Sequence, residues 1–125
     1  MSGDLTGKKI LVVEDEYFIA ADLKKELSGR GAVVIGPVGN LMSALSLIKS
    51  EQVDAAVLDV NLEGARSYPV MEELGRLSVP YMLLTGCDEW SLPEEWRNIP
   101  RITKPCSTDA IVRLLGELIA WHPAS

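Results

Sequence analysis

The residues with the clearest chemical potential in this 125-residue chain are carboxylates that directly follow apolar runs. Residues 55–58 read Ala-Ala-Val-Leu and are followed by Asp59, while the apolar run 10–13 is followed by Glu14 and Asp15. A continuous apolar run of this length is typical of a strand buried on both faces of a parallel sheet. We therefore expect these carboxylates at the carboxyl ends of two strands, where open α/β sheets bind ligands.

Two other strand candidates end in polar residues of different chemistry. Thr85 follows the apolar run 79–84 and precedes Gly86, and Lys104 follows the short run 101–103. Carboxylates gathered at one sheet edge repel one another, and oxygen ligands without His or Cys favour Mg²⁺. A hydroxyl and an ammonium on the opposite side can hold the oxygens of a phosphoryl group. This combination indicates phosphoryl transfer.

Helical segments are needed between these strands, and several stretches have the i, i+3, i+4 spacing of an amphipathic helix. They are residues 19–27, ended by Gly29 and Gly31; residues 41–48, capped by Asn40; residues 68–77, with Pro69 in the first turn; and a last helix that reaches Ile119 and is capped by Ser107 or Thr108.

The predicted strands are residues 8–13, 32–38, 55–59, 79–85 and 101–104, and residues 63–67 are expected to form a loop. Residues 87–100 leave room for about two helical turns before Pro100, with Ser91 and Glu94 at capping-box spacing. Five strands alternating with five helices, the fourth short or irregular, predict a doubly wound α/β fold. Such a fold has a five-stranded parallel sheet covered on both faces.

Composition limits the other possibilities. The net charge of −6 disfavours direct binding to nucleic acid, because that binding depends on Lys and Arg neutralising phosphates. The two cysteines have no metal or redox spacing, and there is no signal peptide or membrane-spanning run. We expect one cytoplasmic domain over residues 1–125, without membrane contact and without an output domain.

The ordered strand-end residues resemble the receiver domains of bacterial two-component response regulators. The matching features are Glu14-Asp15, Asp59, Thr85-Gly86 and Lys104-Pro105, in the family's order and over essentially the whole chain. The resemblance implies a flavodoxin-like, CheY-like fold with strand order 2-1-3-4-5. It also implies a signalling phosphoacceptor, with at most self-catalysed phosphorylation and dephosphorylation, rather than an enzyme.

The resemblance assigns a role to each site residue. Asp59 accepts the phosphoryl group from a sensor histidine kinase, Thr85 hydrogen-bonds it and Lys104 pairs with it. The predicted Mg²⁺ ligands are Asp15, Asp59, the backbone carbonyl of Asn61, and Glu14 directly or through water. A cis peptide bond is expected before Pro105, and Asn61 and Cys87 are expected to flank the attacking water and tune the phosphoryl lifetime.

A narrower resemblance is to stand-alone receivers of the FATGUY type, carried by residues 83–88 and by the run Asp59-Val60-Asn61-Leu62. Leu83 and Leu84 replace Phe and Ala of that motif, and Asp88 stands in place of Tyr. Arg101 occupies the position, three before the lysine, where the larger family favours an aromatic residue. The signal is therefore expected to leave by another route, such as ordering of residues 87–100.

These features predict a receiver that works through protein partners, either by regulating a target or by relaying phosphate to a phosphotransfer protein. One alternative is a Mg²⁺-dependent phosphatase with an aspartyl nucleophile. That chemistry usually places a second acid two residues after the nucleophile, where this chain has Asn61. Another alternative is an unphosphorylated scaffold, for which a complete acid, threonine and lysine set has no purpose.

Overall fold

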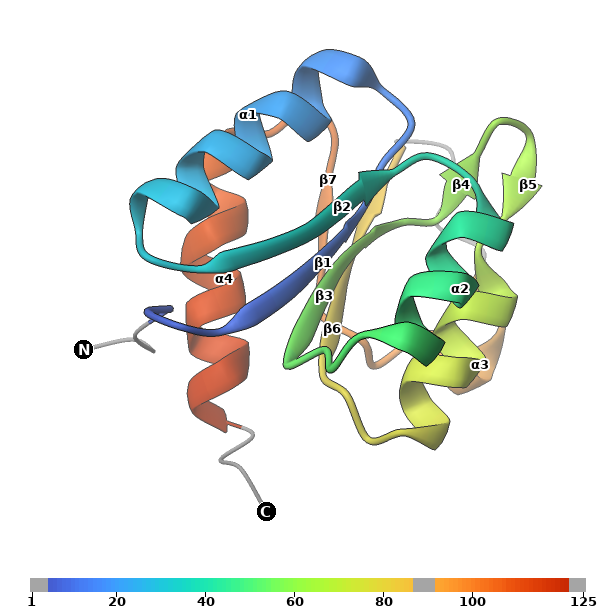
Figure 1. The fold of residues 1–125 in the computed structure, drawn as a ribbon. Coiled ribbons are helices and arrows are strands. Elements are labelled where there is room, and N and C mark those ends of the chain that lie inside the picture. Colours follow the sequence, from blue (N-terminus) through green and yellow to red (C-terminus); the bar gives the residue numbers. More distant parts are fainter. Residues whose placement is uncertain (1–4, 87–91, 122–125) are drawn as a thin grey trace.

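The computed structural model describes residues 5–86 and 92–121, and its centre is a five-stranded parallel sheet (Figure 1). The strands lie in the order β2-β1-β3-β6-β7. Their bounds are β1 (Lys9–Val13), β2 (Val33–Val38), β3 (Ala55–Asp59), β6 (Tyr81–Thr85) and β7 (Arg101–Thr103). Counted along the sheet's own strands this is 2-1-3-4-5, so the predicted doubly wound fold is confirmed.

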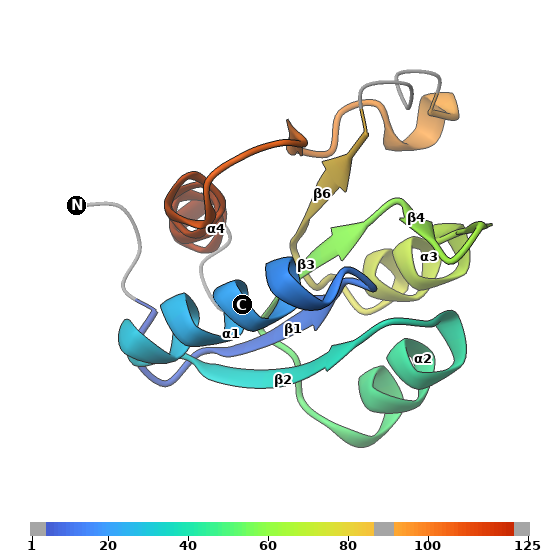
Figure 2. The ribbon, with the colours of Figure 1, turned by 90° about the horizontal axis from the view of Figure 1, so that it is seen from above.

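Helices cover both faces of the sheet (Figure 2). One face carries α1 (Tyr17–Gly29) and α4 (Thr108–Trp121), and the other carries α2 (Leu41–Ser50) and α3 (Tyr68–Arg76). None of the helices in the described ranges is both long and apolar enough to cross a membrane.

Alternation along each strand divides the core into two layers. Leu11 and Val13 of β1 pack toward α2 and α3, whereas Ile10 and Val12 pack toward α1 and α4. All four side chains are fully buried. A strand buried on both faces has no position for a polar residue until it ends, which is why the apolar runs stop so abruptly at charged residues.

Side-chain caps fix where two of the helices begin. Asn40 Oδ1 accepts a hydrogen bond from the Ser43 backbone N–H at 2.9 Å, as expected for the start of α2. Ser107 Oγ accepts one from the Ala110 N–H at 3.1 Å, which identifies Ser107 as the cap of α4. Each cap satisfies an N–H that the first helical turn leaves unpaired.

The fourth of the five predicted helices, expected to be short or irregular, is a short 3₁₀ helix in the described residues. Between β6 and β7 they contain only a three-residue 3₁₀ helix, η1 (Glu94–Trp96), in place of a fourth α-helix. The proposed cap residue Ser91 lies outside the described residues. Pro93 directly precedes η1 and Pro100 follows closely, so too little chain remains to propagate an α-helix.

The prediction that residues 63–67 form a loop is wrong, because residues 65 and 66 form a strand. A small antiparallel hairpin joins β4 (Asn61–Leu62) to β5 (Ala65–Arg66). Its two turn residues, Glu63 and Gly64, have positive φ values of 49° and 84°. Two-residue turns of this kind match the twist of paired strands, but Glu is an unusual residue for such a turn and gave no sequence signal.

The segment containing η1 is held by aromatic and arginine contacts. The ring of Trp96 stacks on Tyr68 of α3, with centroids 4.8 Å apart and an interplanar angle of 16°. The Arg101 guanidinium donates hydrogen bonds to the backbone carbonyls of Trp96 and Arg97. These contacts fasten a short helical turn that could not persist alone.

Candidate functional site

Asp59 lies at the carboxyl end of the central strand β3, between β1 and β6. Its side chain is buried and its two oxygens have different partners. Oδ1 accepts a hydrogen bond from the Asn61 backbone N–H at 3.0 Å, and Oδ2 accepts one from Lys104 Nζ at 2.8 Å. Both bonds orient the carboxylate, whose oxygens are the candidate nucleophile.

The acidic pair after β1 lies beside Asp59. Glu14 is buried, and its Oε2 accepts a hydrogen bond from the Glu16 N–H at 2.9 Å. Asp15 is exposed, and its Oδ2 accepts one from the Glu63 N–H at 2.9 Å. One oxygen from each of Glu14, Asp15 and Asp59 lies within 4.8 Å of the others. Because β1 and β3 flank the point where strand order reverses, this cluster occupies the usual ligand position of the fold.

Lys104 enters this cluster from the end of β7. Its backbone N–H bonds to the carbonyl of Thr85 at 2.7 Å, and its peptide bond to Pro105 is cis. Its Nζ lies 2.8 Å from Asp59 Oδ2, 2.9 Å from Glu14 Oε1 and 2.5 Å from Glu16 Oε2. Burial opposes a charged ammonium, but hydrogen bonds to Asp59, Glu16 and Glu14 outweigh burial and raise the pKa of Lys104.

Glu14 is the carboxylate most affected by its surroundings. Burial raises the pKa of Glu14 to about 7, and the charge of Asp59 adds to the increase, although the Glu16 N–H and Lys104 oppose it. Glu14 Oε1 is buried and, despite its 2.9 Å separation from Lys104 Nζ, has no partner at hydrogen-bonding geometry. A buried oxygen without such a partner is costly, and a cation beside it would remove that cost.

A pocket of about 320 Å³ opens over this cluster. It is lined by Asp15, Glu16, Asp59, Asn61, Glu63, Gly64, Gly86 and Lys104. Thr85 ends β6 one position beyond Leu84, the register partner of Asp59, and is buried without lining the pocket. Cys87, the remaining residue singled out from the sequence, lies outside the described residues.

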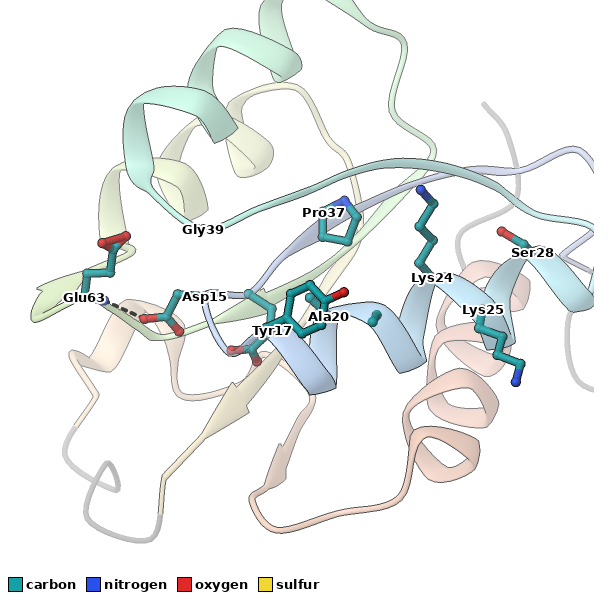
Figure 3. A pocket seen from close by; sticks show the side chains of 11 residues that line it. Asp15, Tyr17, Ala20, Lys24, Lys25, Ser28, Pro37, Gly39 and Glu63 are labelled. Carbon is teal, nitrogen blue, oxygen red and sulfur yellow. Dashed lines mark hydrogen bonds between the residues drawn. The ribbon is translucent and has the colours of Figure 1, made fainter.

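A second hollow, of about 710 Å³, adjoins this pocket along the side of α1. Figure 3 shows Asp15 and Glu63 at one end of it, joined by their hydrogen bond, with Tyr17 beside them and Lys24 farther along α1. Asp15 and Glu63 line both spaces. The acidic cluster is therefore accessible from solvent on two sides.

The donor set fits a hard divalent cation. Three carboxylates from two strand ends, with Asn61 at the pocket wall, provide only oxygen ligands, and an oxygen of Glu14 is buried without a hydrogen bond. Mg²⁺ prefers such ligands and retains several waters, which suits a site open to solvent. The residues present thus agree with the metal that the strand-end carboxylates predicted.

Two residues at this site received no role from the sequence. Glu16 is the third carboxylate of the triplet after β1 and contacts Lys104, so the triplet itself was an available signal. Ser67 is fully buried, and its hydroxyl lies 2.7 Å from the carbonyl oxygen of Asp59 and 3.1 Å from that of Val60. No sequence pattern marked Ser67, because its position depends on the unpredicted β4–β5 hairpin.

A doubly wound sheet with an acidic cluster and a lysine at its switch point defines a class of ligand-binding α/β domains. Residues 10–115 match the model of the response regulator receiver domain family. The chain belongs to this family, and the resemblance found in the sequence is confirmed. Members of the family serve phosphoacceptor signalling in two-component systems.

Individual relatives agree with the family assignment. The solution structure of SdrG from Sphingomonas melonis Fr1 has a TM-score of 0.77 and 34% sequence identity, covering 90% of this chain and 97% of that one. The transcriptional regulatory protein TcrA of Mycobacterium tuberculosis is 36% identical over 86 residues, which are 67% of this chain and 34% of TcrA. The transcriptional regulatory protein PdtaR of the same organism is 24% identical over 109 residues, 84% of this chain and 53% of PdtaR. The chain thus spans about half of PdtaR and a third of TcrA.

Proposed function

We propose that this protein accepts a phosphoryl group on Asp59 from a sensor histidine kinase, in a Mg²⁺-dependent reaction. The observation that carries the proposal is the position of the Asp59 carboxylate. It is buried at the end of β3, with Lys104 2.8 Å away and the Glu14 and Asp15 carboxylates within reach of a shared cation. The family match supports the same chemistry.

In the proposed reaction, an oxygen of Asp59 attacks the phosphorus of a phosphohistidine. A P–O bond forms and the P–N bond breaks, so the imidazole leaves with the electron pair and takes up a proton, and Asp59 becomes an acyl phosphate. The Asn61 N–H and Lys104 hold the carboxylate in position for this attack. Lys104 then pairs with the transferred oxygens, and Thr85 donates a hydrogen bond to one of them.

Mg²⁺, held by Asp15, Asp59, the Asn61 carbonyl and Glu14 directly or through water, would supply positive charge that neutralises the phosphoryl oxygens. The buried Glu14 oxygen and the mutual repulsion of three carboxylates favour its binding. Asn61 and Cys87 are proposed to flank the water that later hydrolyses the acyl phosphate and to influence its lifetime.

We further propose that the chain is a single receiver domain that acts in the cytoplasm through protein partners. Phosphorylation would select one of two conformations of the domain, which a target or phosphotransfer protein then recognises. The related SdrG has a solution structure described as its BeF₃-activated conformation, with 34% identity over 95% of this chain. That relative supports the proposal that this chain also has an activated conformation. The net charge of −6 supports a protein partner over nucleic acid.

The test is incubation with acetyl phosphate and Mg²⁺, followed by intact mass measurement. One phosphoryl adduct is expected on the wild type, and none on Asp59→Asn or after chelation of the metal. An adduct that persists in Asp59→Asn would exclude Asp59 as the acceptor. Steady turnover of a phosphomonoester would instead indicate the phosphatase, and no adduct under any condition would indicate the scaffold.

A further inference from the structure

Carboxylate oxygens surround the ammonium of Lys104, which donates hydrogen bonds to Glu16 and Asp59 and is ion-paired with Glu14. A lysine side chain offers three N–H groups, and three carboxylate oxygens lie within 2.9 Å of Nζ, from Glu14, Glu16 and Asp59. A phosphoryl group on Asp59 brings additional oxygens that need the same N–H groups. The phosphoryl oxygens must therefore compete with the three carboxylates for Lys104.

The three carboxylates differ in the free-energy cost of breaking their contact with Lys104. The side chains of Glu14 and Asp59 are 0% and 7% exposed, and each is also tied by a backbone N–H, from Glu16 and Asn61 respectively. Removing Lys104 from either would leave a buried charge with less compensation, which is costly. The Glu16 side chain is 58% exposed, so water can replace Lys104 there at little cost.

We infer that Glu16 is a positioning residue that competes with the phosphoryl group for Lys104. In the unphosphorylated domain Glu16 accepts a hydrogen bond from Lys104 and holds the ammonium near the N-terminus of α1. On phosphorylation the Glu16 carboxylate turns to solvent and its place on Lys104 passes to a phosphoryl oxygen. Glu16 thereby weakens binding of the phosphoryl group and lowers the extent of phosphorylation at a given donor concentration. This inference rests on the proposed function of Asp59.

The test compares Glu16→Gln with Glu63→Gln, a matched control. Both carboxylates line the 320 Å³ pocket and both substitutions remove one negative charge from it. Glu63, however, contacts the cluster through its backbone N–H, which bonds to Asp15 and is kept in the variant. The two variants therefore share the general electrostatic effect, and only Glu16→Gln weakens the hold on Lys104.

The primary measurement is the affinity for beryllofluoride at saturating Mg²⁺, followed by NMR titration, with Mg²⁺ affinity measured separately by calorimetry. Glu16→Gln is expected to bind beryllofluoride about two- to fivefold more tightly than Glu63→Gln, the range expected for freeing one exposed ion pair. The Mg²⁺ affinities of the two variants should agree. If Glu16 had only a structural role, its substitution would not change the affinity for beryllofluoride while leaving the affinity for Mg²⁺ unchanged.

Equal or weaker beryllofluoride binding by Glu16→Gln would overturn the inference, because Glu16 would then be neutral or would help Lys104. If Glu16→Gln lost affinity for both beryllofluoride and Mg²⁺, the fold would be disturbed and the inference would not be supported. Thermal unfolding of both variants identifies that case. If the wild type binds no beryllofluoride and forms no adduct with acetyl phosphate, it is the proposed function that fails. The two failures are therefore distinguishable.

Discussion

The two carboxylate oxygens of Asp59 have hydrogen-bond partners of different kinds. Oδ1 accepts a hydrogen bond from the nearby Asn61 N–H, whereas Oδ2 accepts one from Lys104, which follows β7 and lies 45 residues further along the chain. The backbone bond persists whatever the state of the pocket, while the lysine bond can be exchanged. A nucleophile with one fixed and one exchangeable partner is oriented before reaction and can rearrange its contacts afterwards.

Clustered carboxylates predict that Mg²⁺ stabilises the folded protein. Asp15→Asn should remove most of this effect, because Asp15 is the exposed member of the cluster. At a Mg²⁺ concentration about 100 times its dissociation constant, the wild type should gain about 2.7 kcal/mol in free energy of unfolding. Urea denaturation with and without Mg²⁺ measures this gain. Glu72→Gln on α3 is the control, and an equal gain in Asp15→Asn would show that Asp15 is not a ligand.

Tyr81 predicts a loss of stability at alkaline pH. Burial, together with the charge of Glu95, raises the pKa of Tyr81 from 10.0 to about 12, against a hydrogen bond with the Trp96 side chain that lowers it. The unfolded chain thus loses this proton at lower pH than the folded one. The contribution of Tyr81 is complete below pH 10 and is lost as pH rises toward 12.

The measurement is the free energy of unfolding of wild type and Tyr81→Phe in denaturant, at several pH values above and below 10. The variant should show a shallower decline than the wild type, because phenylalanine cannot ionise. Parallel declines would mean that other groups account for the alkaline loss.

Among the elements, η1 and β7 are the part of the fold in which this chain departs most from an alternating α/β pattern. Arg101 stands where the family favours an aromatic residue, and its guanidinium is engaged by the carbonyls of Trp96 and Arg97. In the described part of this region an aromatic ring is supplied by Trp96, which stacks on Tyr68 at the start of α3. Ser67, directly before Tyr68, reaches the backbone of Asp59. A contiguous set of contacts thus joins the pocket to η1.

Ser67→Ala tests the first of these contacts. The buried hydroxyl lies within hydrogen-bonding distance of the carbonyl oxygens of Asp59 and Val60, and its removal leaves buried acceptors less satisfied. The free energy of unfolding should fall by about 1–3 kcal/mol. Chemical denaturation measures the change. Ser46→Ala, on the exposed side of α2, should change stability by about 0.5 kcal/mol or less, and an equally small effect of Ser67→Ala would contradict the assignment.

The sequence predicted those elements whose signal is local. Apolar runs located all five sheet strands, and the Asn40 and Ser107 caps are confirmed by their hydrogen bonds. The β4–β5 hairpin was missed because Glu63, the first residue of its turn, is unusual at positive φ. The position of η1 is fixed by the stacking of Trp96 on Tyr68, which lie far apart in sequence. Neither feature can be derived from periodicity.

The same division holds for the site. That Asp15, Asp59 and Lys104 meet follows from a parallel sheet, which brings all strand ends to one edge, and the structure places them there. Which side chain lines the pocket is a finer matter, since Thr85 is buried and Gly86 forms the wall. The carboxylate triplet marks Glu16 as a strand-end residue, but the contact of Glu16 with Lys104 depends on side-chain rotamers, which the sequence does not specify.

For the whole molecule, the two core layers predict a single cooperative unfolding transition. Neighbouring residues of one strand face opposite layers, so neither layer can open without disturbing the sheet that both share. Leu74→Ala, in the layer under α3, and Leu27→Ala, in the layer under α1, should each cost about 2–5 kcal/mol. Both variants should unfold with coincident fluorescence and circular dichroism transitions. Separated transitions in either variant would show that the layers unfold independently.

The directions of the first strand, β1, and the last helix, α4, determine where the domain can be attached to a surface or a fused protein. β1 begins, and α4 ends, at the side of the sheet remote from the pocket, since β1 runs toward the pocket and α4 runs back from it (Figure 1). A tether, fluorophore or fused protein joined beyond Leu5 or Trp121 would therefore enter on that remote side. Molecules immobilised on a sensor chip through either end would present the acidic cluster outward, accessible to a protein partner.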